Sequence, residues 1–244
     1  MGREVVVLDS DESNTSLYWM LGLEGQPLSL MDLAGGREGL DARMKKRHAQ
    51  GPDEPAIPLW DIPSLSSRDI PAAYISHADG VRLVTSGKIN HAMEGCACAM
   101  GSIACEFVKN FSLAEGEIML VDTEAGVEHF GRGVEAGADL VISVVEPSLE
   151  SLNLAATVME MTVASGARYA GAIINKCASP NQVDYMQAKL SEAGVPVLGA
   201  LALSEEIQMA CLEGQALSAQ PCADQIVLGL LAKHETGTVR AVCA

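Results

Sequence analysis

Short apolar runs that end in a polar or acidic residue constrain the fold of this chain more than any other feature. Residues 4–9, 81–86, 117–122 and 140–145 are rich in valine, leucine and isoleucine. Such continuous runs are typical of strands buried on both faces of a parallel sheet. Helical patterns separate them, so the sequence predicts an α/β fold, a mostly parallel sheet with helices on both faces. Further strands are expected at 169–175 and 195–200, and helices at 103–111, 149–164, 181–192, 204–212 and 221–234.

The 244 residues are enough for one large α/β domain, and we expect residues 1–244 to form it. Hydrophobic residues make up 48% of the chain and aromatic residues only 4%, which predicts an aliphatic core. Residues 24–80 are expected to be an irregular surface excursion, because prolines at 52, 55, 58, 63 and 71 interrupt them. A basic run at 43–48 is interpreted as a solvated helix face, with partner docking as the alternative. The tail from residue 235 is expected to fray.

The net charge of −16 argues against two classes of partner. An acidic surface repels phosphate backbones and anionic lipids, so neither nucleic acid nor a membrane is an expected partner. The apolar runs are also far shorter than a membrane span. The chain shows no signal peptide and has an odd number of cysteines, seven, so we expect a cytoplasmic protein with free or metal-bound thiols.

Several polar residues follow the predicted strands, at the edge where ligand sites of open α/β sheets gather. Asp9 and Asp11 come after the first strand, and a functional role competes with simple helix capping in that loop. Asp122 ends a strand and runs into a loop containing Gly126, the pattern of a Walker B element that holds Mg²⁺; a turn-capping acid is the alternative. Asn175 could pair with the edge of adenine or could merely form a turn.

Cys96 and Cys98 lie two residues apart in a glycine-rich stretch, so both sulfurs can point at one object. That object could be a soft metal ion such as Zn²⁺ or Ni²⁺. Four ligands are needed for a closed tetrahedral site, and a twofold axis beside the loop would supply the second pair. The alternatives are two ordinary loop cysteines or a reversible disulfide. We therefore predict a homodimer that shares one ion.

No phosphate-binding Walker A loop exists in the sequence, because G-x-x-x-x-G-K-[ST] is matched nowhere. Ser86-Gly87-Lys88 comes nearest, but Arg82 stands where the motif requires its first glycine, and Ile89 stands where it requires serine or threonine. In nucleotide-binding α/β folds, a first strand, a phosphate loop and a helix normally precede a strand such as that at residues 4–9. Here this strand begins at residue 4. We expect this strand to have lost one neighbour, which would weaken the fold.

The thiol stretch together with the run from Asp122 to Gly133 closely resembles the CooC family, the ATPases that assist nickel insertion into carbon monoxide dehydrogenase. These belong to the MinD/ParA class of P-loop ATPases, with the nitrogenase iron protein. The resemblance covers residues 4 to 234. It implies a nucleotide-binding domain that uses ATP or ADP with Mg²⁺. It also implies that a deviant Walker A loop with two lysines should exist, and this chain lacks it.

The resemblance assigns a role to each candidate residue. Cys96 and Cys98 would bind the metal at the dimer interface. Asp122 would be the Walker B acid, and the loop from 123 to 133, including Gly126, would be switch II. The acids after the first strand would lie in switch I, where Asp11 would orient the attacking water and Asp9 would contact the cofactor; Asn175 would contact adenine. An iron–sulfur bridge is disfavoured because switch II has no cysteine. Two departures from the family pattern are Glu12 and Ala99, which both stand where proline is usual.

The resemblance predicts an ATP-dependent maturation factor that delivers nickel to carbon monoxide dehydrogenase or a related nickel enzyme. ATP hydrolysis by this chain is expected to be deficient, so whether it acts as an enzyme stays open. One alternative is a metal-binding dimer, or metallochaperone, that works without nucleotide. The other is a positioning ATPase of the MinD/ParA type, which the acidic surface disfavours.

Overall fold

The computed structural model describes residues 3–51, 54–55, 57–62, 65–91, 98–218, 221–232 and 238–244. Within these residues, eight strands form one sheet in the order β2-β3-β1-β4-β8-β5-β6-β7. All neighbours are parallel except β2 and β3. The strands are β1 (Val5–Asp9), β2 (Ser76–Ala78), β3 (Val81–Thr85), β4 (Ile118–Asp122), β5 (Leu140–Val145), β6 (Tyr169–Cys177), β7 (Val197–Ala202) and β8 (Val239–Cys243).

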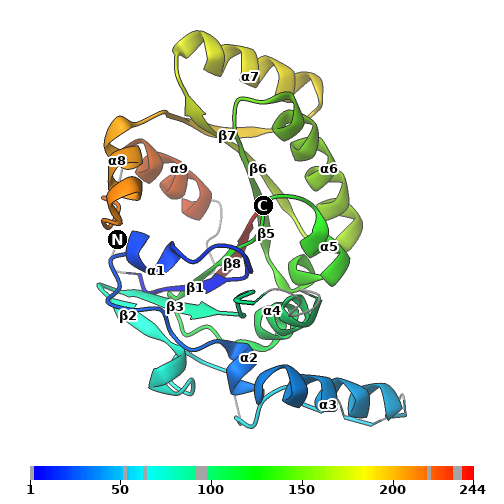
Figure 1. Ribbon diagram of the computed structural model, residues 1–244. Helices are drawn as coiled ribbons and strands as arrows, with labels where there is room; N and C mark the ends of the chain where they lie inside the picture. The colour runs from blue at the N-terminus through cyan, green and yellow to red at the C-terminus, as the bar shows by residue number, and fades with distance from the viewer. Residues whose placement is uncertain are drawn as a thin grey trace.

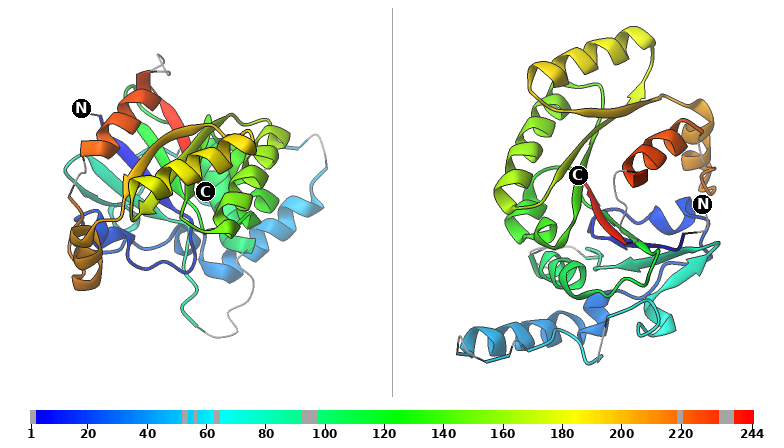
Figure 2. Two further views of the ribbon diagram at one scale, coloured as in Figure 1. Left: turned by 90° about the horizontal axis from the view of Figure 1, so that it is seen from above. Right: turned by 180° about the vertical axis from the view of Figure 1, so that it is seen from behind.

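Helices lie on both sides of this sheet, as the sequence predicts (Figures 1 and 2). The longer ones are α3 (Gly36–Ala49), α4 (Cys98–Asn110), α6 (Leu149–Ser165), α7 (Pro180–Glu192), α8 (Glu205–Glu213) and α9 (Pro221–Ala232). The short ones are α1 (Leu17–Met20), α2 (Leu30–Leu33), α5 (Glu128–Arg132) and the 3-10 turns η1 (Ala72–Tyr74) and η2 (Val134–Gly137). Helices α4, α5, α6 and α7 cover one face, and α1, α8 and α9 lie on the other (Figure 1).

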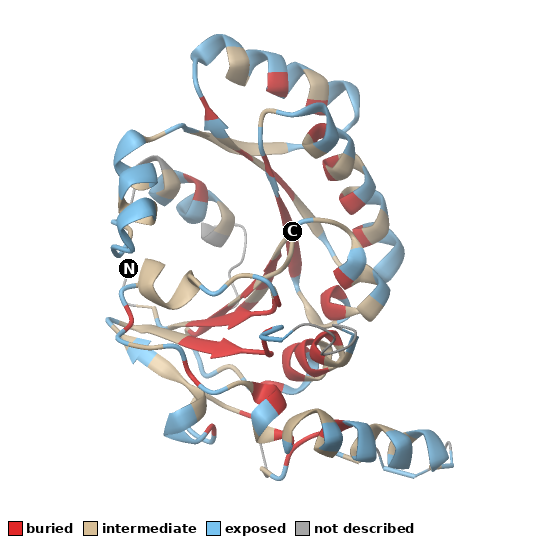
Figure 3. Cartoon of the chain, viewed as in Figure 1, coloured by how far each residue is buried: buried red, intermediate tan, exposed pale blue. Residues whose placement is uncertain are grey.

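The strands are buried because they carry the aliphatic runs, and Figure 3 shows the burial concentrated along them. The largest cluster joins β1, β3 and β4 to α4 through side chains such as Leu8, Val84, Phe107 and Met119, all 0% exposed. Among the described residues, no helix combines the length and the apolar content that a membrane crossing requires. The predicted α/β architecture is confirmed.

The prediction for the tail is wrong. Residues 239–243 do not fray but form β8, which lies between β4 and β5 and pairs with both. Val242 is completely buried, and the backbone N–H of Arg240 donates to Asp139 Oδ2 at 2.8 Å. The run is short and follows a polar segment, so its pattern alone does not distinguish a strand from an unstructured tail.

Two further expectations need correction. The strand β1 has not lost a neighbour, because it pairs over its whole length with β3 on one side and β4 on the other. The excursion over 24–80 is also more regular than expected, since it contains the 14-residue helix α3. The basic run lies on that helix, where Arg47 forms an ion pair with Glu106 of α4 at 2.6 Å. The run therefore docks its own helix in addition to facing solvent.

Candidate functional site

The carboxyl ends of β1, β4 and β8 meet at one edge of the sheet. The strand register sets Asp9 beside Asp122, and Asp122 beside Cys243. Parallel strands in register bring their last residues to the same level, and this edge is where ligands bind in open α/β sheets. The structure therefore brings together two of the acids that the sequence analysis placed at strand ends.

Lys88, which follows β3, forms a buried ion pair at this edge. Its Nζ lies 2.6 Å from Asp9 Oδ2 and donates to the backbone oxygen of Asp11, also at 2.6 Å. The two charged side chains are only 5% and 3% exposed. Sequence reasoning missed this pair because it considered Lys88 only as part of an incomplete phosphate loop. The available signal was a lysine directly after a strand, but its use requires knowing that β1 and β3 are neighbours.

The three aspartates at this edge differ in their electrostatic surroundings. Burial raises the pKa of Asp122 to about 6, and the charges of Asp9 and Asp11 add to this shift. Burial also raises the pKa of Asp9, although the hydrogen bond from Lys88 opposes it. Partial burial acts in the same direction on Asp11, but hydrogen bonds from Ser13 and Asn14 outweigh it and leave the pKa of Asp11 lowered. Asp122 thus titrates near neutrality, while Asp11 stays ionised.

Asp11 is also held by its own loop. Its Oδ1 accepts hydrogen bonds from the backbone N–H and the hydroxyl of Ser13, at 2.8 and 2.7 Å, and from the N–H of Asn14 at 3.2 Å. These bonds are local to the loop and do not cap the following helix α1, whose N-cap is Ser16, without a side-chain cap. The role of Asp11 in orienting water stays a prediction.

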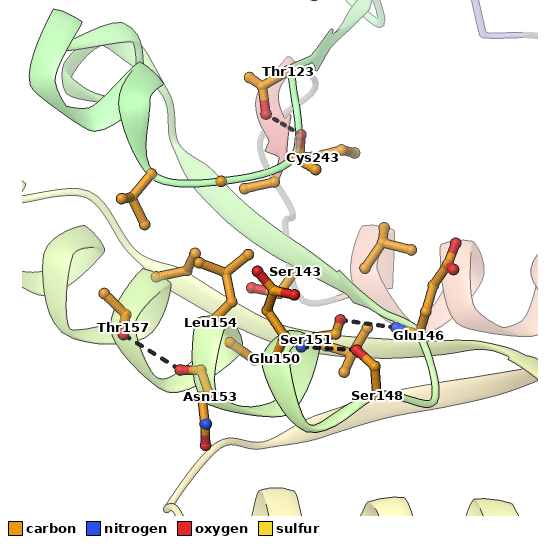
Figure 4. Close-up of a pocket in the computed structure, with 18 of the residues that line it drawn as sticks. Thr123, Ser143, Glu146, Ser148, Glu150, Ser151, Asn153, Leu154, Thr157 and Cys243 are labelled. Atoms are coloured by element: carbon orange, nitrogen blue, oxygen red, sulfur yellow. Dashed lines mark hydrogen bonds between the residues drawn. The ribbon is translucent and has the colours of Figure 1, made fainter.

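A pocket of about 1330 Å³ opens beside Asp122. Its walls are the loop from 122 to 128, the ends of β5 and β8, and the first half of α6 (Figure 4). Thr123 anchors the loop to β8, because its hydroxyl and its backbone N–H both donate to the Cys243 carbonyl, at 2.7 and 3.3 Å. Below the loop, Ser148 caps the start of α6 by accepting from the N–H of Ser151 at 3.0 Å (Figure 4).

Gly126 lines this pocket, whereas Asn175 does not. Gly126 has a φ of 130°, which residues with a side chain rarely adopt, and a Cβ there would lie 2.2 Å from Glu128 Oε2, so Glu128 would have to move. Asn175 lies in β6 and accepts a hydrogen bond from the N–H of Lys176 at 3.0 Å. Because Asn175 lies within a strand, it does not form the turn that was the alternative. Contact of Asn175 with adenine stays a prediction.

Of the two predicted metal-binding cysteines, the structure describes only Cys98. Cys96 lies outside the described residues, and Cys98 is the first residue of α4, where its side chain is exposed. The sulfur of Cys98 is in a disulfide, so binding of a metal by this residue requires reduction first. No group of three or more metal-ligating side chains occurs among the described residues. Metal binding by Cys96 and Cys98 stays a prediction.

His129 of α5 is buried away from the acidic edge. Its Nε2 lies 3.2 Å from Glu135 Oε1, and the two residues are 2% and 0% exposed. Burial lowers the pKa of His129 to about 4 and raises that of Glu135 to about 7. His129 is therefore neutral at neutral pH and packs in the interior.

The residues at the edge fit one part of a magnesium nucleotide and not the other. Asp122 offers a carboxylate, and the buried Oδ1 of Asp9 has no hydrogen-bond partner; Mg²⁺ prefers oxygen ligands of this kind. The β- and γ-phosphates need a cradle of backbone N–H groups and a lysine. The sequence contains no such motif. Asp9 and Asp122 would therefore serve the metal side of such a site, and residues 1–244 contain no motif for its phosphate side.

Solved structures identify the architecture. MinD, the septum site-determining protein of Pyrococcus horikoshii, solved with Mg-ADP, matches 96% of this chain and 84% of its own with a TM-score of 0.62 at 18% identity. A ParA family ATPase of Chlorobium tepidum matches 95% and 86% with a TM-score of 0.56 at 16% identity. The fold is of the MinD/ParA type. At these identities, the likeness of MinD and ParA to the chain concerns the fold alone.

Sequence comparison adds two relatives. An uncharacterized ATP-binding protein of Methanocaldococcus jannaschii is 38% identical over 160 residues, 66% of this chain and 62% of that protein. The carbon monoxide dehydrogenase accessory protein CooC of Rhodospirillum rubrum is 32% identical over 142 residues, 58% of this chain and 53% of CooC. The chain spans between about half and three fifths of the length of these two relatives. No protein-family profile matches it. By sequence and structure together, the chain is similar to CooC/MinD-like P-loop ATPases.

Proposed function

We propose that this chain carries the switch and metal-handling parts of a CooC-type ATPase, which delivers nickel to carbon monoxide dehydrogenase or a related nickel enzyme. It would act in the cytoplasm as a homodimer, with nickel as cargo on Cys96 and Cys98 of both copies. The observation that carries the proposal is the buried contact between Lys88 and Asp9. Through it, the segment that leads into the thiols is fixed to the acidic edge beside Asp122.

The thiols are tested by metal titration of the reduced protein. We expect Ni²⁺ or Zn²⁺ to bind with one ion per two chains and to increase the dimer fraction in native mass spectrometry. The variant Cys96→Ser/Cys98→Ser should lose both effects. Cys105→Ser is the matched control, because Cys105 is a free cysteine on the same helix. Unchanged metal binding by the double variant would refute the proposal.

The phosphate side is tested separately, and we expect negligible ATP turnover by the 244-residue chain. Ala244 follows β8 and lines the pocket beside Asp122. A phosphate loop joins the carboxyl end of a strand to a helix, so a loop placed after β8 would face that pocket. Fusing a G-x-x-x-x-G-K-[ST] turn and a helix to Ala244 should therefore raise the affinity for Mg-ATP by about tenfold or more.

The control for this fusion carries alanine in place of the motif lysine and should bind no better than the parent chain. Equal binding by both fusions would show that the position after β8 does not complete the site. Turnover by the parent chain comparable to that of intact ATPases would overturn the proposed deficiency.

A nucleotide-independent metal-binding dimer is the second candidate, and the missing phosphate motif favours it. Metal titration with and without ATP separates the two: an affinity indifferent to nucleotide, even in the fused chain, supports this second function. A positioning ATPase of the MinD/ParA type would instead keep its dimerisation when both thiols are replaced by serine.

A further inference from the structure

One guanidinium joins the two loops at the acidic edge. Arg132, the last residue of α5, has its Nη1 2.6 Å from Glu12 Oε1 and 3.2 Å from Glu124 Oε1. Glu12 belongs to the loop after β1, and Glu124 to the loop after β4. The same nitrogen therefore contacts an acid from each loop, so neither loop can move without disturbing a charge pair of the other.

The pair with Glu12 is the stronger constraint. The side chain of Glu12 is 3% exposed, and its Oε2 has no hydrogen-bond partner. A carboxylate withdrawn from water in this way depends on its counter-charge, and removing one partner of such a pair is far more costly than losing an exposed pair. The position of the loop after β1 thus depends on where Arg132 holds its guanidinium.

The aliphatic stem of Arg132 fixes a third element. It lies against Gly101 of α4 so closely that a Cβ on that glycine would sit 2.2 Å from Cδ and 3.0 Å from Cγ of Arg132. Glycine weakens a helix interior relative to alanine. Its presence in the first turns of α4 makes room for the arginine, one turn from Cys98, where the helix begins.

The segment before the thiols contacts the same loop. The N–H of Ile89 donates to the Glu12 carbonyl at 3.1 Å, next to the Lys88 contacts with Asp9 and Asp11. The chain on both sides of the thiol stretch is therefore attached to residues 9–12, through Lys88 and Ile89 on one side and through Arg132 and Gly101 on the other.

We propose that Arg132 is a positioning residue that couples the loop after β1 to the start of α4. A shift of Glu12 pulls on the guanidinium, and the stem transmits the shift to the turn of α4 that begins at Cys98. Under the proposed function, this coupling would link the acidic edge to the thiols. The coupling itself rests on the contacts of Arg132, and only its biological role rests on the proposed function. Its test uses neither nucleotide nor metal, so the two can fail independently.

A double-mutant cycle tests the coupling. Glu12→Gln removes the charge, and Gly101→Ala displaces the arginine stem without changing any charge. If Arg132 connects them, the effect of the double variant on the unfolding equilibrium constant should depart from the product of the single effects by roughly fivefold or more. In the Arg132→Met background the effects should simply multiply. Asp61→Asn, which breaks the Arg43 pair on α3, is the control and should multiply with Gly101→Ala in both backgrounds.

Hydrogen exchange gives a second readout that loss of stability alone would not produce. Glu12→Gln should speed exchange of the amides at 99–104 relative to those at 150–160 in α6. If Gly101→Ala does not fold, Arg132→Met replaces it: this variant keeps an unbranched stem beside Gly101 but removes the charge beside Glu12, so Glu12→Gln should no longer change exchange at 99–104. Multiplicative effects with Arg132 present, coupling that persists without it, or unchanged exchange at 99–104 would each overturn the proposal.

Discussion

Among the residues that the structure describes, two lysine–carboxylate pairs lie at the carboxyl edge of the sheet, and they differ in burial. Lys88 and Asp9 lie 2.6 Å apart with side chains 5% and 3% exposed, whereas Lys176 and Glu146 lie 2.5 Å apart with 55% and 50% exposed. The distance is nearly the same, but water screens only the second pair. The ion pair on the β1–β3 side of the edge is therefore shielded from water, while the pair on the β5–β6 side is exposed to it.

The largest expected effect comes from breaking the enclosed pair. Lys88→Met keeps the length of the side chain but leaves Asp9 buried without its counter-charge, so we expect a loss of about 3–5 kcal/mol in the free energy of unfolding. Urea denaturation measures this loss. The double variant Asp9→Asn/Lys88→Met should recover most of it, and a double variant as unstable as the single one would contradict the ion-pair explanation.

The next effect concerns Asp122, whose pKa burial raises from 3.8 to about 6. The folded chain holds this proton more tightly than the unfolded chain, so the contribution of Asp122 to stability falls as the pH rises from about 4 to about 6. Asp122→Asn removes the penalty and should stabilise the chain by roughly 2 kcal/mol at pH 7, with little effect at pH 4.

Thermal or urea unfolding at both pH values checks this difference. His129 and Glu135 also titrate in this range, but they are present in both proteins and cancel in the comparison. Glu146→Gln removes an acid of the exposed pair and is the control, which should change the stability little at either pH. A stability difference between parent and Asp122→Asn that does not change with pH would refute the buried-carboxylate explanation.

The smallest effect is expected at the exposed pair. Lys176→Met should change the free energy of unfolding by less than about 1 kcal/mol, because solvent-exposed ion pairs contribute little. Addition of 1 M NaCl should reduce even this difference. A loss as large as that of Lys88→Met would contradict the claim that burial makes the two ion pairs differ in their contribution to stability.

The sequence predicted the part of the edge that depends on local pattern. Aliphatic runs predicted six of the strands, and the acids that end two of these runs, Asp9 and Asp122, were predicted to lie at the edge of the sheet. Both predictions need only a short segment of sequence, because the run shows that a strand is buried and its last residue shows where the strand ends. The ion pair of Lys88 was not predictable in this way, since its partner lies 79 positions away and the neighbours of β1 follow from the sheet order. The same applies to Arg132, whose three contacts come from three different elements.

Helix α3 was predicted only over its basic run at 43–48, and strand β8 was missed, for a different reason. The residues of α3 are mostly polar, with only Leu40 buried, so no apolar stripe marks it. Strand β8 is five residues long and follows helix α9, so no strand directly before it in the sequence indicates its place in the sheet. In both cases distant partners stabilise the element, which local propensity does not record.

The place of β8 also sets the order in which the protein can assemble during translation. Strands β4 and β5 do not touch each other, since β8 lies between them. The ribosome makes β1 to β7 before it reaches residues 239–243, so a nascent chain carries two half-sheets whose facing edges stay open. Those edges can pair with other nascent chains until β8 is made, so the interval between the synthesis of β7 and that of β8 is the one most exposed to aggregation.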